Sequence, residues 1–285
     1  MGEHRGTRRT TRPILAAVPL FRRRRDDVVV EPEPVVPVGP APRGEVAQRL
    51  QSVAPDSGRQ LADGLLPAIR FAIRREPDVA IDIARSKLGG APDLPRGTFW
   101  PSWTRPDGEK QLLQFFAQVD LAEAAAAAPS ELGLPADGLL SFFADFDPEN
   151  GSVPRPEAVV FYSPANSQFA RCSLRMVPVA TAQLHPLGTW SWPASSDGAG
   201  LKAFEQEHES GLHTQAPEHY HVTARHQLGG HISGADGFVL LQFDSDPTME
   251  VAWGQAGGAG RLVWTMPAAD MASRNWSTGR FSLLP

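Results

Sequence analysis

The sequence predicts an α+β protein with a largely antiparallel β-sheet system and a few packing helices. Segments of strand length are dense in apolar residues and few helix-length segments separate them, whereas parallel strands need a crossover helix. The tetrapeptide LLQF also recurs at 112–115 and 240–243. Two related halves are one interpretation of this repeat, although the order of the elements differs between the halves.

The first 44 residues differ in composition from the rest of the chain. Residues 1–25 contain eight arginines and a single acidic residue, and residues 26–44 alternate valine with proline. Proline fixes φ and removes an amide donor, which disfavours a central strand and favours a semi-extended linker. We therefore predict a disordered basic arm and linker over residues 1–44, followed by a single α+β domain over residues 45–285.

Charge and cysteine content exclude several classes of partner. The formal net charge of the whole chain is −5, so the body behind the arginine-rich arm is acidic. An acidic body argues against nucleic acid, because phosphate neutralisation needs a basic face, and it favours a basic protein partner. Cys172 is the only cysteine, which rules out an internal disulfide and fits a reducing cytoplasm. No segment reaches the ~20 apolar residues of a membrane helix, so we predict a cytoplasmic protein without membrane contact.

The first half of the folded chain is predicted to contain two helices, one strand and a proline-rich strap. Residues 78–84 alternate apolar side chains with a strand period. The strap, residues 86–101, holds three glycines and three prolines, so we expect a tight turn at Gly89-Gly90 and a Trp100 that folds back onto Pro92 or Pro95. Apolar residues at helical spacing predict amphipathic helices around Val46, Leu50 and Val53 and around Leu61, Leu65, Ile69 and Ile73.

The remaining elements are predicted from apolar density and from helix start signals. Asp120 and Glu123 form a capping-box pattern ahead of a run of alanines, and Asp270 is placed to cap a short terminal helix. The proline-rich, polar segment 163–215 is expected to be irregular. Strands are predicted over residues 111–119, 138–146, 157–163, 237–246 and 260–266.

Several motifs in this order resemble the bacterial YwqG-like family, a domain of unknown function. They read SKLGGAPDLPRGTFWP, LLQFFAQVDLAE, LPADGLLSFFAD, HQLGGH and LLQFDSD followed by WGQAGGAGRLVWTM, and the likeness spans roughly residues 76–276. The resemblance implies an α+β fold with two related halves and no established enzymatic activity. Some relatives lie in bacterial toxin–immunity loci, which implies a toxin-neutralising role. The chain has Trp253-Gly254-Gln255 where the family usually has Trp-Gly-Asp, so a contact made by that aspartate is weakened here.

Two tryptophans and two aspartates are the predicted binding residues. Asp244 and Asp246 lie two apart at the end of an apolar strand, so their side chains project from one face. Trp253 follows amid small residues, and Trp100 ends the strap in the other half. If the halves are related, the two tryptophans flank one groove with the aspartates on its rim, and such aromatic anchors concentrate binding energy. The alternative is that both tryptophans are core residues.

A metal-assisted hydrolase built on Asp244, Asp246 and a histidine cluster is the alternative function. The segment HESGLH resembles a zincin motif, but its two histidines are five residues apart instead of four, which turns the second away from the first on a helix. We therefore predict neither a bound metal nor another cofactor. The cluster comprises His208, His213, His219, His221, His226 and His231, of which His219 and His221 share one face if their segment is a strand.

The leading hypothesis is a non-enzymatic, cytoplasmic protein-binding module with an immunity or stress-related role. It depends on the acidic body, which suits a basic partner, and on the family resemblance. No catalytic residue is predicted, because the sequence contains no nucleophile elbow of the Gly-x-Ser-x-Gly type.

Overall fold

The computed structural model describes residues 40–128, 132–145, 158–172, 180–196, 198–232, 237–251, 253 and 260–285, all within the structural unit Pro37–Pro285. Of the arm and linker predicted for residues 1–44, residues 1–39 lie outside the described residues. Helix α1 begins at Arg43. Among the helices of the described ranges, none is long and apolar enough to cross a membrane.

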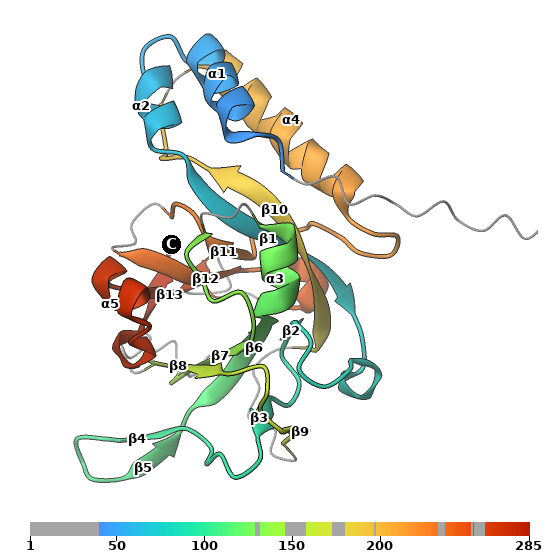
Figure 1. The fold of residues 1–285 in the computed structure, drawn as a ribbon, viewed down its shortest axis with the longest axis vertical. Coiled ribbons are helices and arrows are strands. Elements are labelled where there is room, and N and C mark those ends of the chain that lie inside the picture. The colour runs from blue at the N-terminus through green and yellow to red at the C-terminus, as the bar shows by residue number, and fades with distance from the viewer. Residues whose placement is uncertain are drawn as a thin grey trace, which may run out of the picture. The chain divides into compact units, whose positions relative to one another are not determined.

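Ten strands form one antiparallel sheet, and helices pack against it, which confirms the predicted α+β class (Figure 1). The strand order is β14-β13-β12-β11-β1-β10-β2-β6-β7-β8. These strands are β1 (Leu66–Arg75), β2 (Lys87–Leu88), β6 (Gln114–Asp120), β7 (Leu139–Ala144), β8 (Ala158–Ser163), β10 (Ala182–Ser191), β11 (Gln227–Gly229), β12 (Phe238–Asp244), β13 (Arg261–Met266) and β14 (Arg280–Leu284). Two further strand pairs are β3 (Asp93–Pro95) with β9 (Phe169–Arg171) and β4 (Ser102–Thr104) with β5 (Lys110–Leu112).

The strand order is symmetric about the centre of the sheet, where β1 pairs with β10. Outward from β1 the sheet continues through β11, β12, β13 and β14, and outward from β10 through β2, β6, β7 and β8. The registers correspond as well, because Gln227 faces Gln242 between β11 and β12 while Lys87 faces Gln118 between β2 and β6. The two halves are therefore related in topology. The first strand of each half is exchanged, because β1 pairs with β11 of the second half and β10 pairs with β2 of the first half. This exchange obscures the repeat along the chain.

Strands β2 and β11 lead into the same kind of glycine turn. Gly89 and Gly90 have φ values of 60° and 71°, and Gly229 and Gly230 have values of 72° and 75°. This left-handed region favours glycine, and a Cβ atom on Gly90 would lie only 2.5 Å from Asp78 Oδ1. The tight turn predicted at Gly89-Gly90 is confirmed.

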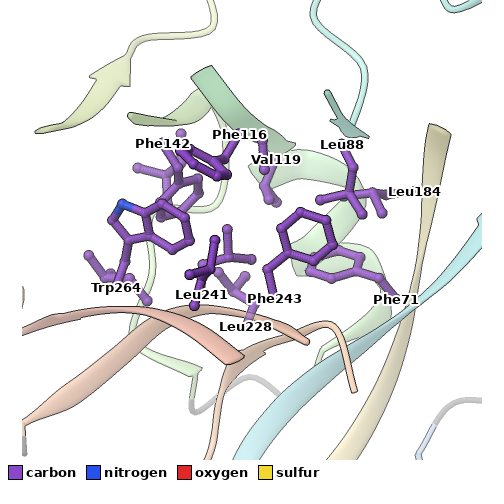
Figure 2. Close-up of a cluster of buried hydrophobic side chains, with 14 of the residues drawn as sticks. Phe71, Leu88, Phe116, Val119, Phe142, Leu184, Leu228, Leu241, Phe243 and Trp264 are labelled. Atoms are coloured by element: carbon purple, nitrogen blue, oxygen red, sulfur yellow. The ribbon is translucent and has the colours of Figure 1, made fainter. Parts of the chain in front are cut away.

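The sheet curls around the main hydrophobic core, so that its edge strands β8 and β14 approach each other. Tyr162 of β8 stacks on Trp276 just before β14, with 5.8 Å between the ring centroids. On the enclosed face Trp264 is fully buried, and its ring centroid lies 5.3 Å from that of Phe116 and 5.8 Å from that of Phe142 (Figure 2). Aromatic side chains from both halves thus share one core.

Five α-helices are found in the described ranges, and α1, α2 and α4 gather at one end of β1 and β10 (Figure 1). Trp190 of β10 anchors this end: it packs in a cluster with Leu50 of α1 and Phe204 of α4, and its Nε1 donates to Ala41 O at 2.8 Å. The helices are α1 (Arg43–Val53), α2 (Gly58–Asp63), α3 (Leu121–Ala127), α4 (Ala199–Gln215) and α5 (Ala268–Ser273).

The second predicted helix is wrong, because most of it forms β1. Ile69 and Ile73 are four residues apart, which fits one face of a strand as well as one face of a helix. Ile69 lies in the main core whereas Ala72 packs in a separate cluster with Leu212 of α4. Both faces of this central strand are covered, so its sequence does not alternate as a half-exposed strand would.

The strand predicted over residues 78–84 is also absent. A 3₁₀ helix, η1 (Asp78–Ala80), and a turn take its place. The expected burial of one face is also absent, since Ile81 is buried while Val79 is 88% exposed and Ile83 is 53% exposed. The backbone turns where the Asp78 carboxylate accepts hydrogen bonds from Lys87 Nζ at 3.0 Å and Ala91 N at 3.1 Å. The periodicity of the sequence gives no indication of these hydrogen bonds.

The segment 163–215, predicted to be irregular, contains β10 and the long helix α4. The sequence of β10 predicts a loop because it contains Pro186 and Gly188. Gly188 is required by packing instead, because a Cβ atom there would overlap the carbonyl oxygen of Ala127 in α3. Four strands are confirmed with ends shifted by up to two residues, namely those predicted over 138–146, 157–163, 237–246 and 260–266. The strand predicted over 111–119 is divided at Leu113 into the end of β5 and the longer β6.

The helix cap at Asp120 is confirmed, but the reciprocal half of the capping box is not formed. Asp120 Oδ1 accepts a hydrogen bond from Ala122 N at 2.9 Å. Glu123 instead accepts hydrogen bonds from Ser86 Oγ at 2.8 Å and from Arg85 Nη1 at 3.0 Å. Helix α3 is thereby tied to the strap.

Helix α5 differs from its prediction in the position of the cap. The residue that precedes its first turn is Pro267, so Asp270 lies inside the first turn instead of capping the helix. A carboxylate there still interacts favourably with the positive end of the helix dipole.

Candidate functional site

Three polar side chains form a row across adjacent strands on the outer face of the sheet. Arg70 of β1 faces Gln227 of β11, and Gln227 faces Gln242 of β12. Residues that pair directly across strands point to the same face, so the three side chains lie next to one another. All three are buried, although their strands are otherwise rich in apolar residues.

The polar row forms the floor of a cavity of about 180 Å³ that lies beside α4. We call it the arginine cavity, because Arg70, Arg225 and Arg261 all line it. Its other lining residues are Thr189, Trp190, Ser191, Trp192, Pro193, Ala194, Glu205, His208, Glu209, Gln227, His231, Ile232 and Gln242.

Two of the three arginines share one carboxylate. Arg70 Nη1 donates to Glu209 Oε1 at 2.6 Å, and Arg225 Nη2 donates to the same oxygen at 3.2 Å. Burial alone would raise the pKa of Glu209, but the charges and hydrogen bonds of Arg70 and Arg225 outweigh it and lower that pKa. Arg261 forms no ion pair or hydrogen bond with the side chains of the described ranges.

Two polar atoms on the floor of the cavity are buried and have no hydrogen-bond partner among the described residues. They are Nε of Arg70, whose side chain is 7% exposed, and Oε1 of Gln242, which is fully buried. The remaining groups of these side chains are engaged, because Arg70 Nη2 donates to Ala224 O at 3.4 Å and Gln242 Nε2 donates to Asp244. A buried donor or acceptor without a partner costs about 1–3 kcal/mol, so the floor is polar beyond what the fold requires.

His208 separates the arginine cavity from a larger groove of about 640 Å³ between α1 and α4. Its Nε2 lies 2.6 Å from Thr189 Oγ1, and its ring meets Trp192 edge-on at 5.2 Å between centroids. Burial lowers the pKa of His208, which keeps the imidazole neutral near pH 7. The side chain therefore acts as an uncharged wall.

The structure places the two predicted tryptophans in different hydrophobic clusters. Trp253 is 5% exposed in the main core, packs on Phe243, and donates from Nε1 to Asp244 O at 3.1 Å. Trp100 packs edge-on against Phe143 and donates from Nε1 to Leu113 O at 2.7 Å. Neither tryptophan lines the arginine cavity or the groove beside it.

The two predicted aspartates have separate partners. Asp244 accepts a hydrogen bond from Gln242 Nε2, and it faces Arg261 across the strand pair. Asp246 is fully buried and lies 3.0 Å from His226 Nε2. Burial alone would raise the pKa of Asp246, but hydrogen bonds from His226 and Thr248 outweigh it and lower that pKa far below its ordinary value.

Of the histidines and aspartates of the hydrolase hypothesis, His226 and Asp246 are in contact, but the set as a whole is not brought together. His226 is buried with Asp246, whereas His213, His219 and His221 are exposed. His219 lies in a turn with a φ of 70°, so it does not share a strand face with His221. Within the described ranges, no three His, Cys, Asp or Glu side chains are placed to hold a metal ion.

Sequence reasoning named His208 and His231 of the arginine cavity as members of the histidine cluster, but it missed the arginines, the glutamines and Glu209. The signal available was a polar residue inside an otherwise apolar strand, as with Arg70 in AIRFAI and Gln242 in VLLQF. Glu209 and Arg225 had no such signal, because α4 and the loop after it reach the cavity only through the fold.

No curated protein matches the chain. A family model described as "Domain of unknown function (DUF1963)" matches residues 86–283, which include β2 to β13 and most of β14. The match begins after β1, so Arg70 precedes it, whereas Glu209, Arg225, Gln242 and Arg261 lie within it. Since this match covers well over half of the sequence, the chain belongs to the family described as Domain of unknown function (DUF1963).

Proposed function

We propose that this chain is a binding protein whose arginine cavity takes a small ligand with a carboxylate group. The observation that carries the proposal is the pair of cationic groups that lack a protein partner among the described residues, the Arg261 guanidinium and the buried Nε of Arg70. Guanidinium groups bind carboxylates through charge-assisted hydrogen bonds in a fixed geometry.

Charge within the cavity favours an anion. Glu209 is the carboxylate that neutralises both Arg70 and Arg225, so one of these positive charges is left without compensation by Glu209. Arg261 adds a further positive charge and Glu205 a further negative one, so three arginines and two glutamates line the cavity. Because the side chains of the floor are buried, an ion pair formed there is screened less than one on the surface.

Volume restricts the ligand to a small molecule. The cavity of about 180 Å³ is below the roughly 300–1,000 Å³ typical of pockets for drug-sized ligands. Each water occupies about 30 Å³ in the liquid, so the cavity has room for a molecule with only a few carbon atoms.

Calorimetric titration with succinate tests this proposal. We expect saturable binding to the full chain at low salt, and at least about tenfold weaker binding by Arg261→Gln, because a lost charge-assisted hydrogen bond contributes about 1.5–3 kcal/mol. Arg49→Gln is the matched control, since Arg49 lines the neighbouring groove and pairs there with Glu207. Absence of binding by the wild-type chain, or equal losses in the two variants, would refute the proposal.

Binding of a basic protein partner is a second candidate function. The exposed carboxylates Glu205 and Glu207 on α4 favour it, together with the acidic composition of the chain. Membership of the YwqG-like group within the family would add a toxin-neutralising or stress-related partner.

The test uses a purified basic protein encoded beside the gene for this chain. Because charges on the rim of an interface mainly govern the association rate, we expect Glu205→Lys to slow association about threefold at low salt. Glu218→Lys makes the same charge change at an exposed position outside α4 and serves as the control. Equal effects of the two variants on the association rate would argue against a partner at α4.

A further inference from the structure

The first half of the sheet carries a second polar row at the position equivalent to the floor of the arginine cavity. Lys87 of β2 faces Gln183 of β10 on one side and Gln118 of β6 on the other. By strand order and register, Lys87 corresponds to Gln227, and Gln118 corresponds to Gln242. Each row therefore holds two glutamines and one cation, which lies in the middle of the first row, at Lys87, and at the end of the second row, at Arg70.

In the first half, one aspartate of the strap satisfies this floor. Asp93 N donates to Gln118 Oε1 at 2.9 Å, and Gln118 Nε2 donates to Asp93 Oδ2 at 2.9 Å. Asp93 Oδ2 also lies 3.3 Å from Lys87 Nζ, and Arg171 Nε donates to Asp93 Oδ1 at 2.8 Å. A single residue thus offers an N–H group to the glutamine and a carboxylate to two cations.

In the second half, no residue of the described ranges satisfies the floor in this way. Gln242 Oε1 has no hydrogen-bond partner among the described residues, and neither has Arg70 Nε. Counted from the glycine pair, GGAPD in the first half corresponds to GGHIS in the second, so Ser233 stands in the sequence where Asp93 stands. Serine has no carboxylate to offer a cation.

We infer that the ligand of the arginine cavity is a free α-amino acid, with its amino group at Gln242 Oε1 and a carboxylate at Arg70 Nε and Arg261. This inference rests on the proposed binding function and specifies the ligand class. The molecule provides the two kinds of group that Asp93 provides in the first half, a nitrogen-bound hydrogen and a carboxylate.

The experiment compares L-aspartate with succinate, which has the same two carboxylates but no amino group. We expect the wild-type chain to bind L-aspartate at least about tenfold more tightly, since an unmade hydrogen bond at a buried acceptor costs about 1–3 kcal/mol. Gln242→Met removes the acceptor and keeps a similar length, so it should weaken aspartate binding about tenfold and change succinate binding less than threefold. If this variant does not fold, the ratio of the two affinities of the wild-type chain, for L-aspartate and for succinate, tests the inference alone.

The outcomes separate this inference from the proposed function. Saturable binding of both compounds with equal affinity would overturn the amino-acid assignment and leave the carboxylate site standing. Absence of binding by either compound would refute both. Aspartate blocked with acetyl and methylamide caps represents an aspartate residue within a peptide. If the wild-type chain binds this compound more tightly than free L-aspartate, the ligand is an acidic peptide and the assignment of a free amino acid is wrong.

Discussion

Replacing Lys87 with methionine is expected to lower the free energy of unfolding by about 3–5 kcal/mol, the range found when one partner of a buried ion pair is removed. Lys87 is fully buried, and its Nζ lies 3.0 Å from Asp78 Oδ1 and 3.3 Å from Asp93 Oδ2. Both carboxylates are buried as well, so the variant leaves negative charge in the interior with Arg171 as the remaining neighbouring cation in the cluster. Urea denaturation followed by tryptophan fluorescence measures the loss.

The control for Lys87→Met is Arg75→Met, which breaks the ion pair of Arg75 with Glu250. These side chains are 51% and 73% exposed, so screening by solvent limits the loss to at most about 1 kcal/mol. A loss below about 1 kcal/mol for Lys87→Met itself would mean that the strap is not held by this cluster.

Replacing Asp246 with asparagine is expected to cost about 2–3 kcal/mol at pH 7, and the difference from wild type should shrink in acid. The fully buried carboxylate accepts hydrogen bonds from Thr223 Oγ1 at 2.9 Å and from Thr248 N at 2.8 Å, and His226 Nε2 lies 3.0 Å away. Hydrogen bonds to a charged group each contribute about 1.5–3 kcal/mol, and the amide of asparagine turns a donor toward part of this set.

The direction of the pH effect follows from the lowered pKa of Asp246. Between the ordinary pKa of an aspartate, about 3.9, and the lower value in the folded chain, the unfolded state binds more protons than the native state. The stabilisation by Asp246 is thus complete above about pH 5 and declines as the pH falls toward the folded-state pKa. Asparagine does not titrate, so the variant lacks this decline.

Unfolding free energies of wild type and Asp246→Asn, measured by urea denaturation from pH 7 to pH 3, test this expectation. Asp56→Asn is the control, because Asp56 is exposed. A difference between wild type and Asp246→Asn that stays constant over this range would show that the carboxylate is not held in its charged form by His226 and the threonines.

Local sequence patterns were sufficient where a strand or helix is defined by its own side chains. The apolar segments around Phe116, Phe142 and Trp264 predicted strands of the main core, and Asp120 predicted the start of α3. The glycine pair after Lys87 predicted a turn, since only the backbone conformation at those residues decides it. These are the features for which burial and backbone preference act within a few residues.

Patterns failed where packing from a distant element changes what a residue needs. β1 resembles a helix because it is covered on both faces, by the main core at Ile69 and by α4 at Ala72. β10 resembles a loop because Gly188 makes room for Ala127 of α3. In both cases the deciding contact comes from a segment far along the chain.

The sequence by itself determined the α+β class, five of the ten strands of the large sheet and the glycine turns. The LLQF repeat indicated two related halves, but its register differs from that of the structure, where Gln242 corresponds to Gln118 and not to Gln114. Only the tertiary structure decided that β1 and β10 are exchanged between the halves, and that Glu209, Arg225 and Arg261 meet Arg70 over Gln242. The physical reason is that periodicity reports which face of an element is buried, whereas a cavity depends on which faces of different elements meet. The exchange of the first strands pairs β1 with β11, and this pairing places Arg70 next to Gln227 on the floor of the arginine cavity.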